Sequence, residues 1–339
     1  MRIAYIDKLK GVTIALVVMG HIMGCSIGAP RPFGFIGSFH MPLFIFLSGI
    51  FAYKGLKQWN MREVGEFLRK KTMRLLLPFF IVGGLFCALL RLSTDLSIWS
   101  MIGGYWYLPA LFYDMIFGLI AILAAHFTPP YIFRSKLILN VLYGVFVYFI
   151  LSVLYIKGIR FPFFLHAVKM FPFFFAGALF GLSEKARALI AHNNWVYTLS
   201  VVIYFALMLT GTSVDFITLT GPFAIVILMN LFARHDAKIP RWLATVGEYS
   251  LEIYVFHWFF FPSMPWLKGV LAMNPTGALL NNYNFVPTFI VFTFLVAGVI
   301  AVCMLLGAII RHSPLLSMII LGARFDKKPK HENNSEGGE

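Results

Sequence analysis

The chain has 339 residues, of which 60% are hydrophobic and only 12% are charged, and its formal net charge is +14. Apolar runs of about 20 residues recur along it, which excludes a soluble globular domain. The positive charge does not point to nucleic acid, because basic loops of a membrane protein hold its topology and contact anionic lipid.

The apolar runs are continuous and do not alternate with polar residues, so they predict membrane-spanning helices and not strands. We expect an all-α fold, a polytopic membrane helix bundle with about ten transmembrane helices. This domain is expected over residues 1–312, with a cytoplasmic C-terminal tail over 313–339 that is disordered from about residue 326. The predicted spans are 9–27, 37–54, 74–91, 105–125, 136–156, 168–183, 195–211, 215–233, 250–268 and 286–310.

The basic residues predict the orientation of this bundle. With a cytoplasmic N-terminus, alternate segments place 22 of the 28 Lys and Arg residues inside. Six lie outside, namely Arg31, Arg91, Lys157, Arg160, Lys169 and Lys268. This asymmetry follows the positive-inside rule, so both termini are expected in the cytoplasm.

The first span carries a cation and a histidine on one helical face. Lys10 and His21 are eleven residues apart, close to three helical turns, which separates them by roughly 16 Å along the axis. Lys10 thus lies at one membrane surface and His21 near the middle of the bilayer. An ionisable group at that depth is costly and indicates a functional site.

Other ionisable residues also fall within predicted spans. They are His40, Asp114, Glu252 and His257. Each group needs a polar partner in hydrocarbon, so several are expected to share one cavity. A histidine with a carboxylate partner is the usual apparatus for taking a proton from a hydroxyl. Asp114 is equally compatible with a hydrogen bond to a neighbouring helix, and His40 and His257 with packing or interfacial roles.

Two further cations, Lys71 and Arg74, lie at the start of the third span on the side of Lys10. They are three residues apart and share a helical face. Such a cluster can serve lipid headgroups, or it can bind the phosphates of a ligand. An elongated ligand with phosphates at one end and a reactive group at the other, such as coenzyme A, suits this arrangement.

At these residues the chain resembles the acyltransferase 3 family of integral-membrane O-acyltransferases, and within it the fucose 4-O-acetylase-like branch. Lys10 and His21 match the family pattern of Arg or Lys, ten residues, then His. Lys71-x-x-Arg74 stands where the family has Arg-x-x-Arg, a departure that weakens forked phosphate contacts. Further matching stretches are 5–11 (YIDKLKG), 38–49 (SFHMPLFIFLSG), 106–111 (WYLPAL) and 247–257 (GEYSLEIYVFH).

The resemblance implies transfer of an acetyl group from cytosolic acetyl-CoA to a hydroxyl of a cell-surface or lipid-linked saccharide. It implies His21 as general base or acyl relay, and Lys10, Lys71 and Arg74 as ligands of the donor's phosphates. His40, Asp114 and His257 are second candidates for catalysis, and Trp106 and Tyr107 for stacking on the acceptor sugar. No permanently bound cofactor and no metal are expected. The expected location is the bacterial inner membrane.

Two functions other than acyl transfer are also compatible with the sequence. A transporter or flippase of a glycan or lipid-linked intermediate would bind there, but the chain lacks the two-fold hydropathy repeat that many transporters carry. A scaffold within a polysaccharide assembly complex would be insensitive to His21 and Arg74. The three cysteines lie in separate spans without metal-ligand spacing and are expected to pack as small apolar groups.

Overall fold

The structure is a computed structural model that describes residues 4–22, 37–54, 56, 60–91, 102–129, 131, 135–209, 217–261 and 285–323. The elements in this part of the chain are helices, with no strand among them, which confirms the predicted all-α class. They are α1 (Ala4–Ile22), α3 (His40–Ile50), α4 (Met61–Pro78), η2 (Phe79–Gly83), α5 (Gly84–Arg91), η3 (Gly103–Tyr105), α7 (Tyr107–Phe127), α8 (Lys136–Ile156), α9 (Phe164–Leu182), α10 (Glu184–Arg187), η4 (Ala188–His192), α11 (Asn194–Leu209), α12 (Ile217–Arg234), η6 (Asp236–Lys238), α13 (Trp242–Glu248), α14 (Ser250–Phe256), η7 (His257–Phe260), α16 (Phe285–His312) and α17 (Pro314–Leu321).

Within the described ranges, five helices are long and apolar enough to cross a membrane. They are Met61–Leu90, Tyr107–Phe127, Lys136–Ile156, Phe164–Leu182 and Ile290–His312. Shorter apolar helices occupy His40–Ile50, Asn194–Leu209 and Leu219–Arg234. The fold is therefore an α-helical membrane bundle, while the count of ten spans and the cytoplasmic termini stay predictions.

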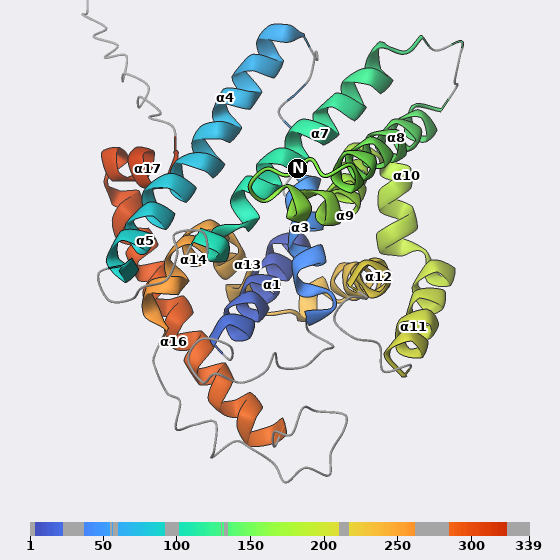
Figure 1. Ribbon diagram of the computed structural model, residues 1–339. Helices are drawn as coiled ribbons and strands as arrows, with labels where there is room; N and C mark the ends of the chain where they lie inside the picture. Colours follow the sequence, from blue (N-terminus) through green and yellow to red (C-terminus); the bar gives the residue numbers. More distant parts are fainter. Residues whose placement is uncertain are drawn as a thin grey trace, which may run out of the picture.

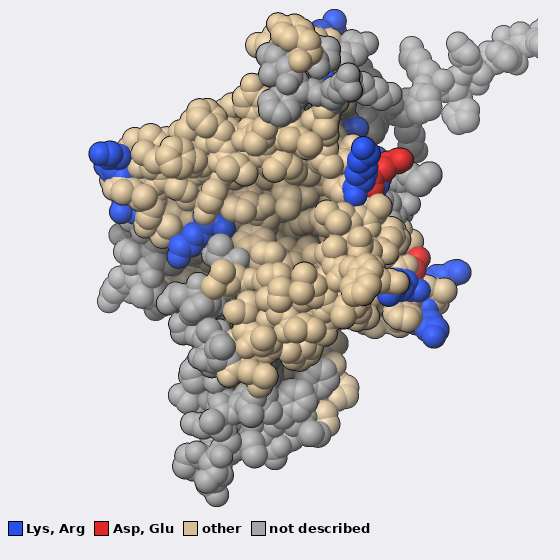
Figure 2. Space-filling view, turned by 90° about the vertical axis from the view of Figure 1, so that its right-hand side faces the viewer, with Lys and Arg blue, Asp and Glu red and all other residues tan. Residues whose placement is uncertain are grey.

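The perimeter of the bundle is apolar. On the face shown in Figure 2, uncharged side chains cover most of the described surface, and Lys and Arg lie mainly near its margins. On α8, Val145, Phe146 and Phe149 are 61%, 57% and 63% exposed. Such side chains suit contact with lipid tails, so α8 is a peripheral helix of the bundle.

α1 is the central helix. It packs against α3, α12, α13, α14 and α16 (Figure 1), and its buried residues lie on all sides of the helix. A helix that is buried all round belongs to a protein core. This position explains how α1 keeps Lys8 and Lys10 in its first turns, because neighbouring helices shield them from hydrocarbon.

An ion pair between a buried lysine and a partly exposed aspartate fixes the start of α1. Lys8 is 6% exposed, and its Nζ lies 2.7 Å from Oδ1 of Asp236 in η6. Lys8 Nζ also donates to the backbone carbonyl of Asp236. A second pair joins Arg311 of α16 to the buried Glu252 of α14 at 2.6 Å. These contacts account for two charged groups that would otherwise be unpaired in the interior.

Glycines let α3 and α9 cross at very short range. A Cβ added to Gly177 would clash with the backbone of Phe46, and one added to Gly181 with the backbone of Ile50. On the facing helix, a Cβ at Gly49 would clash with the carbonyl of Phe174. Small residues at such spacing allow helix backbones to approach in membranes, where packing drives association.

The same device joins α1 to α13. A Cβ added to Gly11 would clash with the carbonyl of Leu243, and one at Gly247 with the carbonyl of Asp7. The two glycines are reciprocal, since each faces the helix that carries the other. They hold the start of α1 against the segment that leads into α14.

Two of the predicted spans differ from the helices that the structure shows. The third was predicted over 74–91, but its helix begins at Met61, where the Asn60 side chain accepts a hydrogen bond from the Glu63 amide. A π-helical turn follows Pro78, which lacks the amide hydrogen that a regular helix needs. The ninth was predicted as one helix from 250; in the structure α14 ends at Phe256, and a 3₁₀ turn begins at His257.

The predicted C-terminal tail contains structure at its start. α17 lies within it, and a Cβ added to Gly322 just beyond would clash with the backbone of Met73 in α4. Gly322 has a φ of 62°, in the left-handed region where glycine is favoured. The region expected to be disordered, from about residue 326, lies outside the described residues, as do the ends of four spans (23–27, 210–211, 215–216 and 262–268).

Candidate active site

All three predicted phosphate ligands lie together at one end of the bundle. Lys10 comes from α1, and Lys71 and Arg74 come from α4. Each lysine interacts electrostatically with Arg74, and the two lysines interact with one another. The structure therefore brings these cations from two helices into one cluster.

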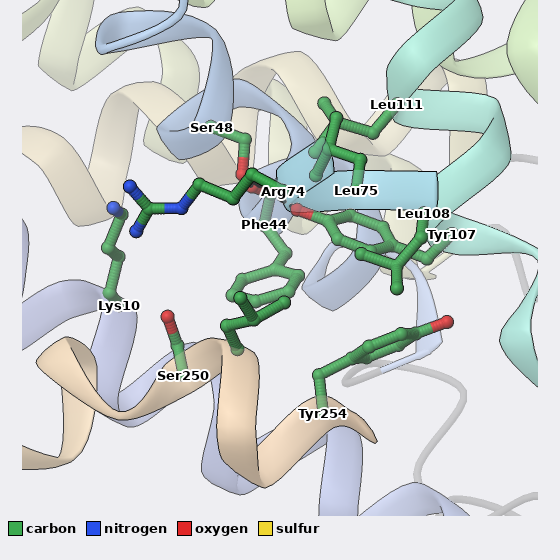
Figure 3. A pocket seen from close by; sticks show the side chains of 11 residues that line it. Lys10, Phe44, Ser48, Arg74, Leu75, Tyr107, Leu108, Leu111, Ser250 and Tyr254 are labelled. Atoms are coloured by element: carbon green, nitrogen blue, oxygen red, sulfur yellow. Dashed lines mark hydrogen bonds between the residues drawn. The ribbon is translucent and has the colours of Figure 1, made fainter. Parts of the chain in front are cut away.

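Lys10 and Arg74 line a cavity of about 110 Å³ that begins at this cluster. In Figure 3 their charged ends lie side by side at one edge, and the rings of Tyr107 and Tyr254 lie away from them. The wall is formed by α1, α3, α4, α7 and α14. Its full lining is Lys10, Phe44, Ser48, Arg74, Leu75, Tyr107, Leu108, Leu111, Ser250, Leu251 and Tyr254.

Hydrogen bonds hold the aromatic end of the cavity. The Ser48 hydroxyl donates to the carbonyl of Phe44 at 3.0 Å, so its oxygen accepts the hydrogen of the Tyr107 hydroxyl at 2.7 Å. The Tyr254 hydroxyl donates to the carbonyl of Gly104 at 3.4 Å. The rings of Tyr107 and Tyr254 are 5.1 Å apart. These two rings therefore form a fixed wall.

Tyr254 lines the cavity and also lies near the two histidines. Its ring centroid lies 5.9 Å from that of His257, and the His257 ring lies 5.3 Å from that of His21. His21 is in the last turn of α1, and the 3₁₀ turn after α14 carries His257. The cation cluster and the histidines are thus connected through Tyr254.

The backbone determines the tautomer of His257. Its Nδ1 lies 2.6 Å from the carbonyl oxygen of Tyr254 and 3.0 Å from that of Ile253. Both oxygens can only accept, so Nδ1 carries the hydrogen, and in the neutral ring Nε2 presents a lone pair. His257 is fully buried, and Nε2 has no hydrogen-bond partner among the described residues. A buried acceptor without a partner indicates a bound polar group or a functional role.

Trp258 completes the histidine cluster. Its indole ring lies 4.6 Å from the ring of His21 and 5.4 Å from that of His257. Its buried Nε1 also lacks a hydrogen-bond partner in the described part of the chain. An unused donor of Trp258 and the unused acceptor of His257 therefore belong to two rings that pack near His21, which is the pattern of a site that binds a polar group.

Asp114 lies apart from this cluster. It is fully buried in α7, which packs against α4, α8 and α9. Its electrostatic neighbours include Tyr53 and Tyr107, and neither carboxyl oxygen has a hydrogen-bond partner among the described residues. The groups that orient His257 are two backbone carbonyls, so its Nδ1 does not use a carboxylate partner.

The other predicted site residues, His40, Trp106 and Tyr107, have surroundings that differ from one another. His40 is the first residue of α3, at the opposite end of that helix from Phe51, over which Lys10 lies. Trp106 stacks on His166 with ring centroids 4.6 Å apart, whereas Tyr107 faces the cavity. Ser48, Tyr254 and Trp258 were not predicted as site residues.

Asp114→Asn is therefore expected to reduce acyl transfer by at most about tenfold. Loss of a carboxylate that orients a catalytic histidine costs roughly 10⁴-fold, but the titratable groups with which Asp114 interacts include two tyrosines, Tyr53 and Tyr107. The measurement is the turnover number of purified protein, normalised to its amount in detergent. A loss near 10⁴-fold in a protein that elutes and melts like the wild type would show that Asp114 belongs to the catalytic group.

The family of the chain follows from comparison with known proteins. A family model described as an acyltransferase domain, acyltransferase 3, matches residues 3–308. The comparisons with curated proteins and with solved structures found no match. The matched region contains all the site residues described above, from Lys10 to Trp258.

Proposed function

The chain belongs to the acyltransferase 3 family, and from this we propose that it is a membrane O-acetyltransferase. It moves an acetyl group from acetyl-CoA to a hydroxyl of a saccharide. The observation that carries the proposal is the cavity with Lys10 and Arg74 at one end and Tyr254 at the other, beside the His21–His257 pair. An elongated donor with phosphates and a distant thioester fits this order of groups.

The donor's pyrophosphate is bound at the cation cluster. Arg74 offers a forked set of donors, while Lys10 and Lys71 contribute point charges. The pantetheine arm runs past Ser48 and Tyr107 toward Tyr254, which brings the thioester to the histidines. With the predicted topology, the donor enters from the cytoplasm.

The chemical step transfers the acyl group from the thioester sulfur of the donor to the hydroxyl oxygen of the acceptor. His21 takes the proton from the acceptor hydroxyl as its oxygen attacks the thioester carbonyl, and the protonated imidazole then gives that proton to the departing thiolate of coenzyme A. The Nε2 lone pair of His257 accepts a hydrogen bond from the acceptor saccharide, and Trp258 Nε1–H donates a hydrogen bond to the developing oxyanion. In a two-step variant, the imidazole of His21 attacks the thioester carbonyl and coenzyme A leaves as its thiolate; the acceptor hydroxyl then attacks the acyl-imidazole, the imidazole of His21 leaves, and the hydroxyl proton passes to the thiolate.

The acceptor is a cell-surface or lipid-linked saccharide that arrives from the other side of a bacterial inner membrane. Trp106 and its partner His166 present stacked rings beside Tyr107 at the start of α7. Aromatic faces of this kind stack well on sugar rings. The assignment to the fucose 4-O-acetylase-like branch rests on the sequence motif at 38–49 alone.

Purified protein tests this function directly. In detergent with acetyl-CoA and extracted surface glycans, we expect release of free coenzyme A together with acetylated glycan, detected with a thiol reagent and by mass spectrometry. A transporter or flippase would leave the thioester intact. Intact acetyl-CoA with every glycan fraction, from protein that is folded and monodisperse, would overturn the proposal.

Trp258→Phe is expected to lower the turnover number by about 10²-fold, the usual loss when one oxyanion donor is removed. Phenylalanine keeps an aromatic ring against His21 and deletes only the indole N–H. The matched control is Trp195→Phe, because Trp195 is 86% exposed. Equal turnover in the two variants would assign Trp258 a packing role.

A further inference from the structure

A second cavity lies at the same end of the bundle as Lys10, and the proposed reaction does not use it. Its volume is about 450 Å³, and it lies between the C-terminal ends of α3 and α9 and the short helix α10. It is lined by Gly49, Ile50, Phe51, Tyr53, Lys54, Ala178, Phe180, Gly181, Leu182, Glu184 and Arg187.

One side-chain contact joins this cavity to the first. Lys10 lines the first cavity, and its Nζ lies 4.7 Å from the centre of the Phe51 ring, which lines the second. Lys54 also approaches that ring, at 5.7 Å. On α3, consecutive residues Ser48 and Gly49 line the first and the second cavity respectively. The two cavities are therefore neighbours, separated by the contact between Lys10 and Phe51.

The lining of the second cavity combines cations with one accessible aromatic ring. Lys54 and Arg187 supply the positive charge, and the partly exposed Phe51 supplies the ring, whereas Tyr53 and Phe180 are only 2% and 0% exposed and form the wall behind it. Arg187 is paired with Glu184 at 3.4 Å, but Glu184 is 93% exposed, so water weakens this pair and leaves other guanidinium donors for a ligand. Gly49 and Gly181 remove side-chain bulk from the wall.

This chemistry fits a nucleotide. Aromatic faces bind a flat base, and a lysine with an arginine binds a phosphate. A lipid headgroup would supply the phosphate without a use for the Phe51 ring, and the contact of that ring with Lys10 favours a ligand shared with the first cavity.

We propose that the second cavity binds the adenosine 3′-phosphate end of the acyl-CoA donor, with Lys54 and Arg187 on the 3′-phosphate and the adenine against the ring of Phe51. The proposal rests on the proposed function, since it assigns the far end of the same donor. It makes the two cavities one binding site, with the pyrophosphate at Lys10 and Arg74 between the nucleoside and the pantetheine arm.

The test compares acetyl-CoA with acetyl-dephospho-CoA, which lacks only the 3′-phosphate. In wild-type protein we expect KM to be about 10–10²-fold higher for the dephospho donor, the usual effect of losing a hydrogen bond to a charged group, with kcat unchanged. Lys54→Ala and Arg187→Ala should raise KM for acetyl-CoA and leave KM for the dephospho donor unchanged. Lys185→Ala is the control, since Lys185 lies in α10 but outside the cavity lining.

Equal KM values for the two donors in wild-type protein would overturn the proposal, as would variants that raise both values alike. Equilibrium binding of adenosine 3′,5′-bisphosphate separates this outcome from failure of the proposed function. Binding that Arg187→Ala weakens would support a nucleotide cavity even in protein without acyl transfer. If vesicles of phosphatidylglycerol, but not of phosphatidylcholine, displaced the nucleotide, the cavity would be a lipid site and the proposal wrong.

Discussion

His21→Ala is expected to lower acyl transfer by about 10²–10⁴-fold, the range for loss of a general base, while the protein reaches the membrane at its normal level. The expectation follows from the position of His21, whose ring lies against His257 and Trp258. Alanine removes the proton acceptor and leaves the end of α1 helical. The measurement is coenzyme A release by purified protein, beside acetylation of surface glycans in cells.

Two companion variants sharpen the result. His257→Ala should cause a loss of similar size, and the double variant should be little worse than either single one, because groups that act as a unit are not additive. His312→Ala is the control, since His312 is an exposed residue at the end of α16. Undiminished transfer by His21→Ala protein at normal expression would remove His21 from the catalytic role.

Much of the bundle could be predicted because helices in hydrocarbon satisfy their backbone within one segment. A long apolar run therefore predicts a helix without knowledge of its neighbours, and α8 has the bounds predicted for it, Lys136–Ile156. The eleven-residue offset of Lys10 and His21 is also local, since it depends on one helix. The family resemblance came from motifs of the same local kind, and the match over residues 3–308 confirms it.

Contacts between helices were harder to predict, because they depend on how pairs of helices pack. The placement of His257 and Trp258 against His21 requires α14 to end at Phe256 and a 3₁₀ turn to follow. Hydropathy does not register that break, since the sequence stays apolar through it. The depth of Asp114 along α7 likewise does not indicate its neighbours on other helices, which include Tyr53 of the segment after α3.

The α3–α9 crossing gives the second large effect. Gly177→Leu is expected to destabilise the folded protein by well above the roughly 1–3 kcal/mol of ordinary overpacking, because its side chain meets backbone and not a movable side chain. The atom in the way is the carbonyl oxygen of Phe46 on α3. We expect little protein in the membrane fraction and aggregated material on size exclusion, measured with a fluorescent fusion.

The same substitution in open space is the control. Gly298→Leu in α16 adds an equal volume where no atom lies within 4 Å of the new Cβ, so the protein should accumulate and elute normally. Gly177→Ala should lie between the two. If it leaves enough folded protein to assay, its turnover should fall as well, because displacement of α3 moves Ser48 and loosens the 2.7 Å hydrogen bond that fixes Tyr107 in the donor cavity. Normal accumulation of Gly177→Leu protein would mean that α3 and α9 are farther apart than the glycines indicate.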